Sequence, residues 1–404
     1  MNNIVVVGLG YVGLPLAERA NFVGFSVHGV DSNRQVIDRL DATTTTFNSL
    51  STNLQTSGDV DIFVVCVPTP ITDEKQPDLS YINRALTSVS KVLQKGQLVI
   101  VESTVFPGYC ENIGKSILED SSGLIAGVDF YFAHCPERVN PGDSNWDVAN
   151  IPRVIGGVNK KSTKAAMIFY SRITSGELHP VSNMAEAEAS KMIENAFRDI
   201  NIAFVNEMAQ SFDGTDVNIH RVLEASASKP FGFMPFMPGM GVGGHCIPVD
   251  PYYLIASAGK RNFTHSFLSL ARNINDSMIN YVYKKIVAQI KETGLTNPRI
   301  GIFGLTYKPN VSDIRESQSI RLMKLLKSKG LVVKSYDPIV ESDVKLEDSL
   351  FEWANIVVVA VKHDLFVDFE KKINLAHNVR VVIDTAHMIN PDSLKRASYK
   401  GIGL

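Results

Sequence analysis

A cysteine stands in a glycine-rich segment of the chain, and an acid follows it four residues later. The segment is Gly241-Val242-Gly243-Gly244-His245-Cys246-Ile247-Pro248-Val249-Asp250-Pro251. Small neighbours would let the Cys246 thiol reach a bound carbonyl, glycine amides can face a developing oxyanion, and Asp250 can orient water or tune the thiolate. The segment predicts a catalytic nucleophile, with a buried structural cysteine beside a turn as the alternative.

Two further groups of polar residues stand where chemistry is possible. Lys191 and Asn195 are four residues apart in a helical pattern, so they project from one face and together can stabilise an oxyanion or hold a water. Glu137 comes just after an apolar run, in Cys135-Pro136-Glu137-Arg138-Val139-Asn140-Pro141-Gly142. Taken alone, Lys191 and Asn195 are also compatible with an ordinary solvated helix face.

The start of the chain has the pattern of a dinucleotide-binding turn. Gly8-Leu9-Gly10-Tyr11-Val12-Gly13 follows the apolar run 4–7 and opens a helical stretch from Leu14 to Ala20. In G-x-G-x-x-G the glycines permit a tight turn, close approach to pyrophosphate at the helix N-terminus and close helix packing. Asp31 ends the next expected strand, where it can accept both ribose hydroxyls and repel a 2′-phosphate, so NAD is favoured over NADP.

The elements that must position these residues alternate along the chain. Strands are expected at 4–7, 26–30, 61–67, 98–101 and 130–133, with helices between them, which indicates a parallel sheet covered on both faces. Thr69 and Thr104 follow two of these strands, at the sheet edge where ligands bind.

The middle and the end of the chain complete the expected architecture. Long helices are expected at 183–212 and 266–291, the first as a spine and a dimer surface. Strands at 299–303, 332–336, 355–361 and 379–384 then indicate a second, diverged nucleotide-binding fold. The fold class is therefore α/β, with two Rossmann-like doubly wound sheets joined by a central helical domain. We expect domains at 1–180, 181–292 and 293–404.

Composition limits the partners. The chain has 404 residues, a net charge of −2 and dispersed basic residues, so nucleic acid and an anionic membrane surface are not expected as partners. No apolar run approaches the roughly 18 residues that span a bilayer. The four cysteines lack C-x-x-C spacing and the N-terminus lacks a secretory pattern, which favours the cytoplasm. His134-Cys135 and His245-Cys246 lack further ligands at short spacing, so no metal is expected.

Taken in order, these motifs resemble the UDP-glucose/GDP-mannose dehydrogenase family. The resemblance runs from about residue 4 to residue 390 and includes Gly304-Leu305-Thr306-Tyr307-Lys308-Pro309-Asn310, followed by Asp313-Ile314-Arg315-Glu316-Ser317. It implies a four-electron oxidation of the C6 hydroxymethyl of a nucleotide sugar to a carboxylate, with two NAD⁺ and no metal. Cys246 would carry the intermediate as a thiohemiacetal and then a thioester, and a homodimer through the long helix is expected.

The resemblance also implies roles for individual residues. Lys191 and Asn195 would stabilise the oxyanion, Glu137 would act as base for water, Thr104 would hold the catalytic water or the C6 oxygen, and Asp250 would orient water and the lysine. The expected cofactor-binding residues are Gly8, Gly10, Tyr11, Val12, Gly13, Asp31, Thr69, Thr104 and Arg315. The expected substrate-binding residues are Glu137, Arg138, Lys191, Asn195, Phe236, Gly243 and Lys308. Arg198 and Arg272 are left without a firm role.

The segment before the cysteine bears on which sugar is used. Residues 229–240 include Phe233, Met234, Phe236 and Met237, where plain UDP-glucose enzymes have a basic residue. An apolar loop fits a bulkier, N-acetylated sugar, and the quoted motifs are similar to the UDP-N-acetylhexosamine 6-dehydrogenase branch. UDP-N-acetylglucosamine is the expected substrate, for surface polysaccharide precursors. The manno and galacto epimers and UDP-glucose are alternatives, as are a single-hydride dehydrogenase and a non-catalytic NAD-binding protein.

Overall fold

The protein divides into two compact units. The computed structural model describes residues 2–54, 60–139, 145–259 and 261–404. Unit 1 comprises Met1–Glu194 and Tyr252–Thr264, and unit 2 comprises Asn195–Pro251 and His265–Leu404. The three expected domains, with boundaries near 180 and 292, stay a prediction.

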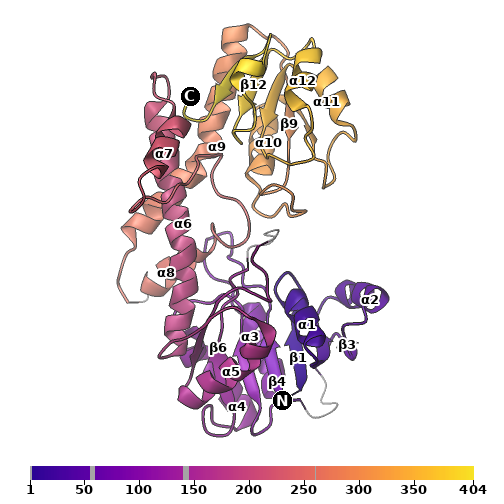
Figure 1. The fold of residues 1–404 in the computed structure, drawn as a ribbon, viewed down its shortest axis with the longest axis vertical. Coiled ribbons are helices and arrows are strands. Elements are labelled where there is room, and N and C mark those ends of the chain that lie inside the picture. Colours follow the sequence, from indigo (N-terminus) through magenta and orange to yellow (C-terminus); the bar gives the residue numbers. More distant parts are fainter. Residues whose placement is uncertain (1, 55–59, 140–144, 260) are drawn as a thin grey trace. The chain divides into compact units, whose positions relative to one another are not determined.

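Unit 1 is built on a mostly parallel sheet of order β3-β2-β1-β4-β5-β6-β7-β8 (Figure 1). Its strands are β1 (Asn3–Val7), β2 (Ser26–Val30), β3 (Ser49–Ser51), β4 (Ile62–Val65), β5 (Leu98–Val101), β6 (Tyr131–His134), β7 (Arg153–Gly157) and β8 (Leu178–Pro180). The neighbours β6 and β7 run antiparallel, whereas the other adjacent strands run parallel. The reversal at β7 departs from the all-parallel sheet that the sequence predicts.

Helices cover both faces of this sheet, because its strands are apolar on both sides. They are α1 (Gly13–Phe22), α2 (Arg34–Thr43), α3 (Ser80–Ser90), the π-helix η1 (Cys110–Gly114), α4 (Lys115–Ser122) and α5 (Lys160–Ile173). Alternate residues of β1 enter different cores: Ile4 and Val6 pack with residues of α1 and α5, while Val5 and Val7 pack with residues of α3 and α4. The period of two along the strand thus builds two separate cores.

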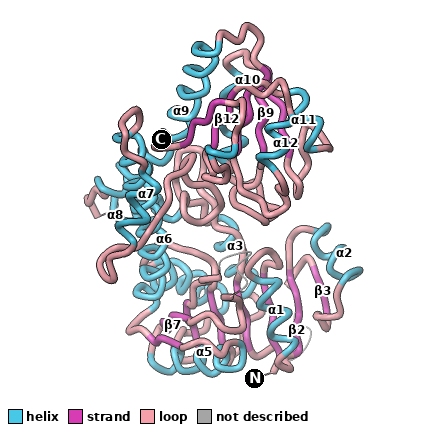
Figure 2. Tube along the Cα trace, turned by 45° about the horizontal axis from the view of Figure 1, so that its top comes forward, coloured by secondary structure: helices cyan, strands magenta, loops and turns pink. Residues whose placement is uncertain are grey.

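Unit 2 contains a smaller, fully parallel sheet of order β10-β9-β11-β12-β13. Its strands are β9 (Arg299–Phe303), β10 (Val332–Tyr336), β11 (Ile356–Val359), β12 (Val381–Asp384) and β13 (Ser398–Gly401), and its helices α10 (Gln318–Ser328), α11 (Glu347–Trp353) and α12 (Phe369–Leu375) lie with them (Figure 2). Residues of α10 and α9 (Ser266–Thr293) pack on one face, and residues of α11 and α12 pack on the other.

Helix α6 (Met184–Phe212) contributes residues to both units, as does α8 (Asp250–Gly259), while α7 (Ile219–Ala227) and the 3-10 turn η2 (Pro391–Ser393) belong to unit 2. Over its 29 residues α6 contains neither Gly nor Pro, so nothing in its sequence breaks the helix. Helix α9 ends at Gly294, whose φ of 67° suits the left-handed position that closes a helix.

The expected fold class is confirmed. The predicted strands at 26–30, 98–101, 299–303 and 332–336 coincide with β2, β5, β9 and β10. The prediction omits β3, β7, β8 and β13. Three of these are short or polar, since Ser49–Ser51 and Leu178–Pro180 have three residues each and Ser398–Gly401 lacks an apolar run, whereas β7 is a buried five-residue strand that the prediction missed. No helix of the described residues is long and apolar enough to cross a membrane.

The first glycine turn yields a prediction about stability. A Cβ on Gly13 would lie 1.8 Å from the Gly8 carbonyl oxygen, whereas a Cβ on Gly10 would meet nothing within 4 Å. We therefore expect Gly13→Ala to lower the free energy of unfolding by about 1–3 kcal/mol or more, because backbone atoms must move apart. Gly10→Ala is the matched control and should unfold like the wild type in thermal melts followed by circular dichroism. Equal midpoints for the two variants would contradict this packing argument.

Candidate active site

The turn between β1 and α1 fits a dinucleotide. Gly8 has a φ of 94°, and a Cβ there would lie 2.7 Å from the Cys66 carbonyl oxygen, so the tight turn requires glycine. Gly10 is exposed and open, which leaves room for pyrophosphate to approach the backbone at the N-terminus of α1. Exposed Tyr11 and half-buried Val12 complete the turn.

Asp31 lies at the end of β2, beside this turn. One carboxylate oxygen accepts the Leu9 N–H at 2.9 Å and the other accepts the Asn33 N–H at 2.8 Å. Because each carboxylate oxygen has two lone pairs, both remain able to accept a ribose hydroxyl. The residues present therefore fit NAD in unit 1.

In the second sheet, Asp337 is the acid that corresponds to Asp31, but its hydrogen-bond partners differ. Asp337 follows β10 as Asp31 follows β2, but its Oδ2 accepts N–H groups of Leu305 and Thr306 and lies 3.2 Å from His363 Nε2. Burial alone would raise the pKa of Asp337, yet hydrogen bonds from His363 and backbone N–H groups hold it at about 2. In addition, α10 begins only at Gln318, well after β9. In the second fold, the His363 side chain thus lies against the carboxylate of Asp337, whereas the printed partners of Asp31 are backbone N–H groups.

The glycines of the cysteine turn lie so close to neighbouring segments that an added Cβ would meet their atoms. A Cβ on Gly241 would lie 2.5 Å from the Asn275 carbonyl oxygen, and Gly241 has a φ of 99°. A Cβ on Gly244 would lie 2.8 Å from the Tyr307 ring, and one on Gly243 would lie 3.0 Å from the Glu316 carbonyl oxygen. The turn is therefore pressed against helix α9 and the segment after β9, which also contains Lys308.

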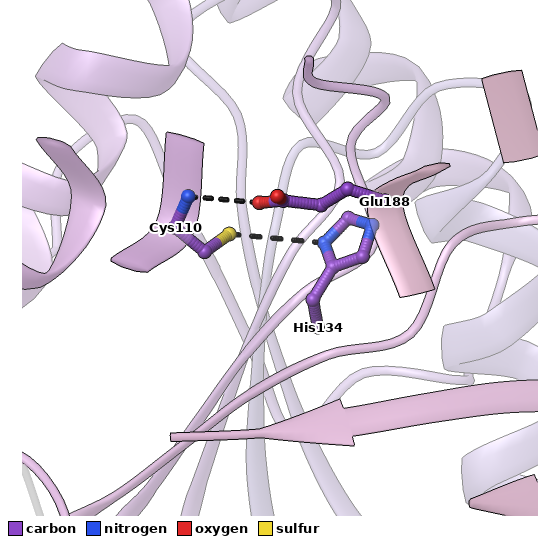
Figure 3. A group of neighbouring side chains, drawn as sticks. All are labelled: Cys110, His134 and Glu188. Atoms are coloured by element: carbon purple, nitrogen blue, oxygen red, sulfur yellow. Dashed lines mark hydrogen bonds between the residues drawn. The ribbon is translucent and has the colours of Figure 1, made fainter. Parts of the chain in front are cut away.

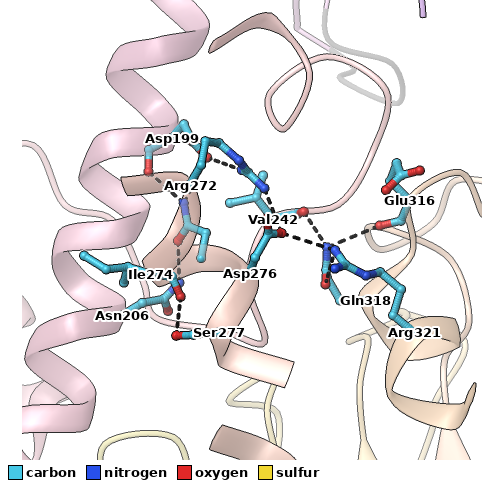
Figure 4. Close-up of polar contacts among 11 residues, drawn as sticks. Asp199, Asn206, Val242, Arg272, Ile274, Asp276, Ser277, Glu316, Gln318 and Arg321 are labelled. Atoms are coloured by element: carbon cyan, nitrogen blue, oxygen red, sulfur yellow. Dashed lines mark hydrogen bonds and ion pairs between the residues drawn. The ribbon is translucent and has the colours of Figure 1, made fainter. Parts of the chain in front are cut away.

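A buried polar network holds the start of this turn (Figure 4). Gln318 Nε2 donates to the Val242 carbonyl at 2.6 Å, and the Gly239 N–H donates to Asn206 Oδ1 at 2.9 Å. Asn206 in turn donates to Asn275, which donates to Asp199. Side chains from α6, α9 and α10 thereby fix the backbone just before Cys246.

Arg272, which the sequence left without a role, is part of this network. It is 3 % exposed and bonds Asp199 at 2.6 Å and Asp276 at 3.0 Å (Figure 4). Through Asp199 it connects to Asn275 and Asn206, which lead to the backbone before the cysteine. Arg198, by contrast, is exposed on α6.

Cys246 itself is half-buried. Its carbonyl accepts the N–H groups of Val249 and Asp250 at 3.0 and 2.9 Å, which leads the chain into α8. Asp250 is 2 % exposed, and its Oδ2 accepts the Asn195 side-chain N–H at 2.5 Å. The structure thus joins two of the predicted catalytic residues, 55 positions apart, within unit 2.

Arg315 also lies against the cysteine turn. Its carbonyl accepts the Gly244 N–H at 3.2 Å, and its guanidinium bonds Asp313 at 2.6 Å and lies 3.0 Å from His245 Nδ1. This places Arg315 in unit 2, whereas the dinucleotide turn belongs to unit 1. Its expected contact with the cofactor stays a prediction.

In unit 1, Glu137 and Lys191 are both nearly buried. Glu137 Oε1 accepts the N–H groups of Arg138 and Val139, and its Oε2 lies 3.3 Å from Arg153 Nη1. Burial alone would raise the pKa of Glu137, but Arg153, the backbone donors and Lys191 hold it below its usual range. Glu137 is therefore a carboxylate at neutral pH and able to accept a proton.

Other predicted residues have simpler surroundings. Thr104 and Thr69 are half-buried after β5 and β4, and the Thr69 carbonyl accepts the Tyr253 hydroxyl at 2.9 Å. Arg138 pairs with Glu194 at 2.8 Å. Residues 140–144, which include the end of the Glu137 motif, lie outside the described residues.

The apolar loop before the cysteine lines a cavity of unit 2. The cavity has a volume of about 420 Å³, and Phe233, Met234 and Phe236 face it together with Phe197 and Phe204 of α6. Phe236 and Phe197 meet edge to face, with ring centroids 6.0 Å apart. Three of the four expected pocket-forming residues thus line the cavity, whereas Met237 does not, and their contact with substrate stays a prediction.

One group of metal-type donors occurs among the described residues, and sequence reasoning missed it because its members come from three distant segments. Cys110, His134 and Glu188 are buried together (Figure 3), with Cys110 Sγ 3.8 Å from His134 Nδ1. Glu188 already accepts the N–H groups of Gly108 and Cys110 at 2.5 and 2.8 Å. These bonds satisfy donors at the start of η1, so we interpret the group as structural.

Sequence reasoning also missed Arg153, which contacts Glu137 directly. Its only sequence signal is a charged residue at the start of the apolar run 153–157. Gln318, which supports the cysteine turn, gives no signal of its own.

Comparisons with known proteins agree with this geometry. Three sequence models of the UDP-glucose/GDP-mannose dehydrogenase family match the chain: the NAD binding domain over residues 2–174, the central domain over 185–277 and the UDP binding domain over 301–391. The chain is 35% identical to a UDP-N-acetyl-D-mannosamine dehydrogenase of Methanocaldococcus jannaschii, over 98% of this chain and 95% of the relative.

Two further relatives are similar over most of their length. A UDP-N-acetyl-D-glucosamine 6-dehydrogenase of Pseudomonas aeruginosa is 36% identical, over 90% of this chain and 88% of the relative. The solved structure of a UDP-D-ManNAc dehydrogenase from Pyrococcus horikoshii has a TM-score of 0.92 and 31% identity, and the match covers 99% of each chain.

The open dinucleotide turn, the second parallel sheet and the three matched family domains lead to one conclusion. The chain belongs to the UDP-glucose/GDP-mannose dehydrogenase family and is an NAD-dependent nucleotide-sugar dehydrogenase with a UDP-binding domain.

Proposed function

We propose that this enzyme oxidises the C6 hydroxymethyl of a UDP-N-acetylhexosamine to a carboxylate, with Cys246 as the covalent carrier. The observation that supports this most is the cysteine turn. A half-buried thiol follows glycines at which a Cβ would lie 2.5 to 3.0 Å from neighbouring atoms, and Asp250, four residues on, is buried with Asn195. Neither alternative class, a single-hydride dehydrogenase or a non-catalytic NAD-binding protein, needs a nucleophile in such a turn.

In the proposed reaction NAD⁺ supplies the hydride acceptor for both oxidations. The Cys246 thiolate adds to C6 of the aldehyde, forming a sulfur–carbon bond and an oxyanion, which Lys191 and Asn195 stabilise. After the second oxidation the same carbon is a thioester. Thr104 holds the C6 oxygen or the water, and Asp250 orients Asn195 and the water.

Hydrolysis completes the proposed cycle. Glu137 takes a proton from water, the water oxygen bonds to C6, and the sulfur–carbon bond breaks. The products are the uronic acid and the free thiol. The pKa of Glu137, held low in the folded protein, supports this role because the base must be ionised before the water arrives.

The proposed sugar carries an N-acetyl group. The apolar cavity beside Phe233 and Phe236 supports a bulkier substrate than UDP-glucose. The names of the relatives include both C2 epimers, mannosamine and glucosamine, at 35% and 36% identity. UDP-N-acetylglucosamine is the epimer that the sequence favours, and UDP-N-acetylmannosamine is the second candidate. The uronic acid would serve a surface polysaccharide.

We also propose a homodimer through α6. Phe197 and Phe204 are seven residues apart on one face of α6 and about half exposed, and Phe267 and Leu270 are exposed on α9. Exposed apolar groups of this size mark contact surfaces. None of the four cysteines forms a disulfide, which supports a reducing compartment such as the cytoplasm.

Asp31 generates a prediction about the cofactor. Asp31→Asn should weaken NAD⁺ binding about tenfold or more, because the neutral amide loses a charged acceptor for the ribose hydroxyls. The preference for NAD⁺ over NADP⁺ should shrink in the same variant. Asp38→Asn, at an exposed pair with Arg34 on α2, is the matched control. Fluorescence titration measures both; unchanged NAD⁺ affinity in the Asp31 variant would rule out the assigned role.

The proposed reaction is tested by counting the NADH molecules formed per molecule of acid. The enzyme is supplied with NAD⁺ and, separately, with UDP-N-acetylglucosamine, UDP-N-acetylmannosamine, UDP-N-acetylgalactosamine, UDP-glucose and GDP-mannose. NADH is followed by absorbance and the acid by mass spectrometry. We expect two NADH per acid, with the highest kcat/KM for an N-acetylhexosamine. One NADH per sugar would indicate a single-hydride enzyme, and UDP-glucose as best substrate would overturn the loop argument.

A variant arm tests the carrier. Cys246→Ser should lower acid formation by about a hundredfold or more, since a hydroxyl is a far weaker nucleophile. Cys110→Ala removes a buried thiol elsewhere and should keep two NADH per acid. Wild-type acid formation by the serine variant would exclude the thioester.

The dimer has its own test. Phe204→Glu should shift the protein from dimer to monomer, because a charge would be buried at the contact. Ile168→Glu, at an exposed apolar residue of α5, is the control and should stay dimeric. Analytical ultracentrifugation measures the mass. An unchanged dimer in the Phe204 variant would show that this face of α6 is not the interface.

A further inference from the structure

One buried guanidinium in unit 1 serves two carboxylates. Arg153, at the start of β7, is fully buried, and its Nη1 lies 3.3 Å from Glu102 Oε1 and 3.3 Å from Glu137 Oε2. Glu102 follows β5 directly and is 1 % exposed. A single cation is therefore shared by the proposed base and by a second acid to which no role has been given.

Hydrogen bonding between Arg153 and the two carboxylates is incomplete among the described residues. Arg153 Nε and Nη2 and Glu102 Oε2 are buried without a hydrogen-bond partner among the described residues. Unmatched charge away from water is costly, so a buried pair of carboxylates on one cation favours a state in which one of them holds a proton. That proton belongs to the pair as a unit.

The groups around each carboxylate determine which of the two acids holds the shared proton. The ionisable groups that face Glu102 are Arg153 from β7, Tyr170 from α5, Glu137 and Cys135 from the segment after β6, and Cys66 after β4. The Tyr170 hydroxyl donates to Glu102 Oε1 at 2.5 Å. Burial raises the pKa of both thiols far above neutrality, so neither adds charge.

The two acids differ in the donors they receive. Glu137 accepts two backbone N–H groups and also feels Lys191, which hold its pKa low. Glu102 has neither, and burial raises its pKa to about 7, with Arg153 opposing and Glu137 contributing. When the pair holds one proton, that proton therefore lies on Glu102, and Glu137 remains ionised.

We propose that Glu102 and Arg153 are positioning residues for Glu137. Arg153 orients the Glu137 carboxylate, and Glu102 sets how strong a base Glu137 is by competing for the same guanidinium nitrogen. When Glu102 is protonated, Arg153 is left to Glu137 and weakens it as a base. When Glu102 ionises, the guanidinium is shared and Glu137 becomes more basic. The kinetic part of this proposal rests on the proposed role of Glu137, whereas the coupling of the two acids does not.

The coupling is tested without substrate. The full-length protein, labelled with ¹³C at the glutamate carboxyl carbons, is titrated by NMR, with Glu102→Gln and Glu137→Gln to assign the two resonances. We expect the Glu102 resonance to titrate near pH 7 and the Glu137 resonance to shift with the same midpoint. In Glu102→Gln the Glu137 shift near pH 7 should vanish. A Glu137 resonance that does not respond to Glu102 would overturn the proposal, whatever the enzyme catalyses.

The consequence for hydrolysis is tested by single turnovers. Rapid quench and mass spectrometry of the protein follow the decay of the acylated Cys246, a state in which the thiol itself no longer titrates. The wild-type rate should rise about threefold or more through a limb near pH 7. Glu102→Gln should stay at the lower plateau, because glutamine mimics the protonated acid. A limb of unchanged position and height in this variant would contradict the proposal.

Two further variants separate positioning from general damage. Tyr170→Phe removes the hydroxyl that stabilises ionised Glu102, so the limb and the NMR midpoint should move to higher pH. An unchanged or lower midpoint would count against the proposal.

Glu188→Gln is the matched control, since burial also raises the pKa of Glu188 to about 7 but its oxygens bond Gly108 and Cys110. It should keep the limb, and loss of the limb there would overturn the assignment to Glu102.

If the protein formed no acid from any sugar in the panel, the proposed function alone would be refuted. The NMR titration would still report whether Glu102 and Glu137 are coupled.

Discussion

Helix α6 is the constraint on which much of the structure depends. Its unbroken ladder of hydrogen bonds carries buried polar side chains at Glu188, Lys191, Asn195, Asp199 and Asn206. Glu188 satisfies the start of η1, Asn195 bonds Asp250, and Asn206 holds the cysteine turn through Gly239. Within unit 2, the fixed rise per residue of the helix sets the spacing of Asn195, Asp199 and Asn206.

Glycine contacts set the second constraint, and they act in both units. Gly13 brings α1 against the turn after β1, and Gly241 and Gly244 bring the cysteine turn against α9 and Tyr307. In each case the missing Cβ lets backbone approach backbone or ring more closely than any other residue allows. The same turn leaves open space beside Gly10, where a Cβ would meet nothing within 4 Å.

The two sheets show how one topology serves two tasks. In both, an acid ends the second strand of the fold, yet Asp31 keeps lone pairs for a ligand while Asp337 is occupied by His363 and backbone N–H groups. The sequence echo between residues 8–11 and 304–307 predicts a second, diverged nucleotide-binding fold but cannot show this difference. The reason is that His363 lies 26 residues from Asp337, and only folding brings them together.

The sequence by itself determined the fold class, most strand positions, the dinucleotide turn and the cysteine turn, because each rests on local periodicity or on glycines at fixed spacing. Only the tertiary structure decided that Arg272 bonds Asp199, that Asn195 bonds Asp250, and that Glu102 shares Arg153 with Glu137. The physical reason is that these interactions join residues from different strands and helices. Burial and charge sharing depend on what surrounds a side chain, and those surroundings are assembled from segments that no local pattern relates.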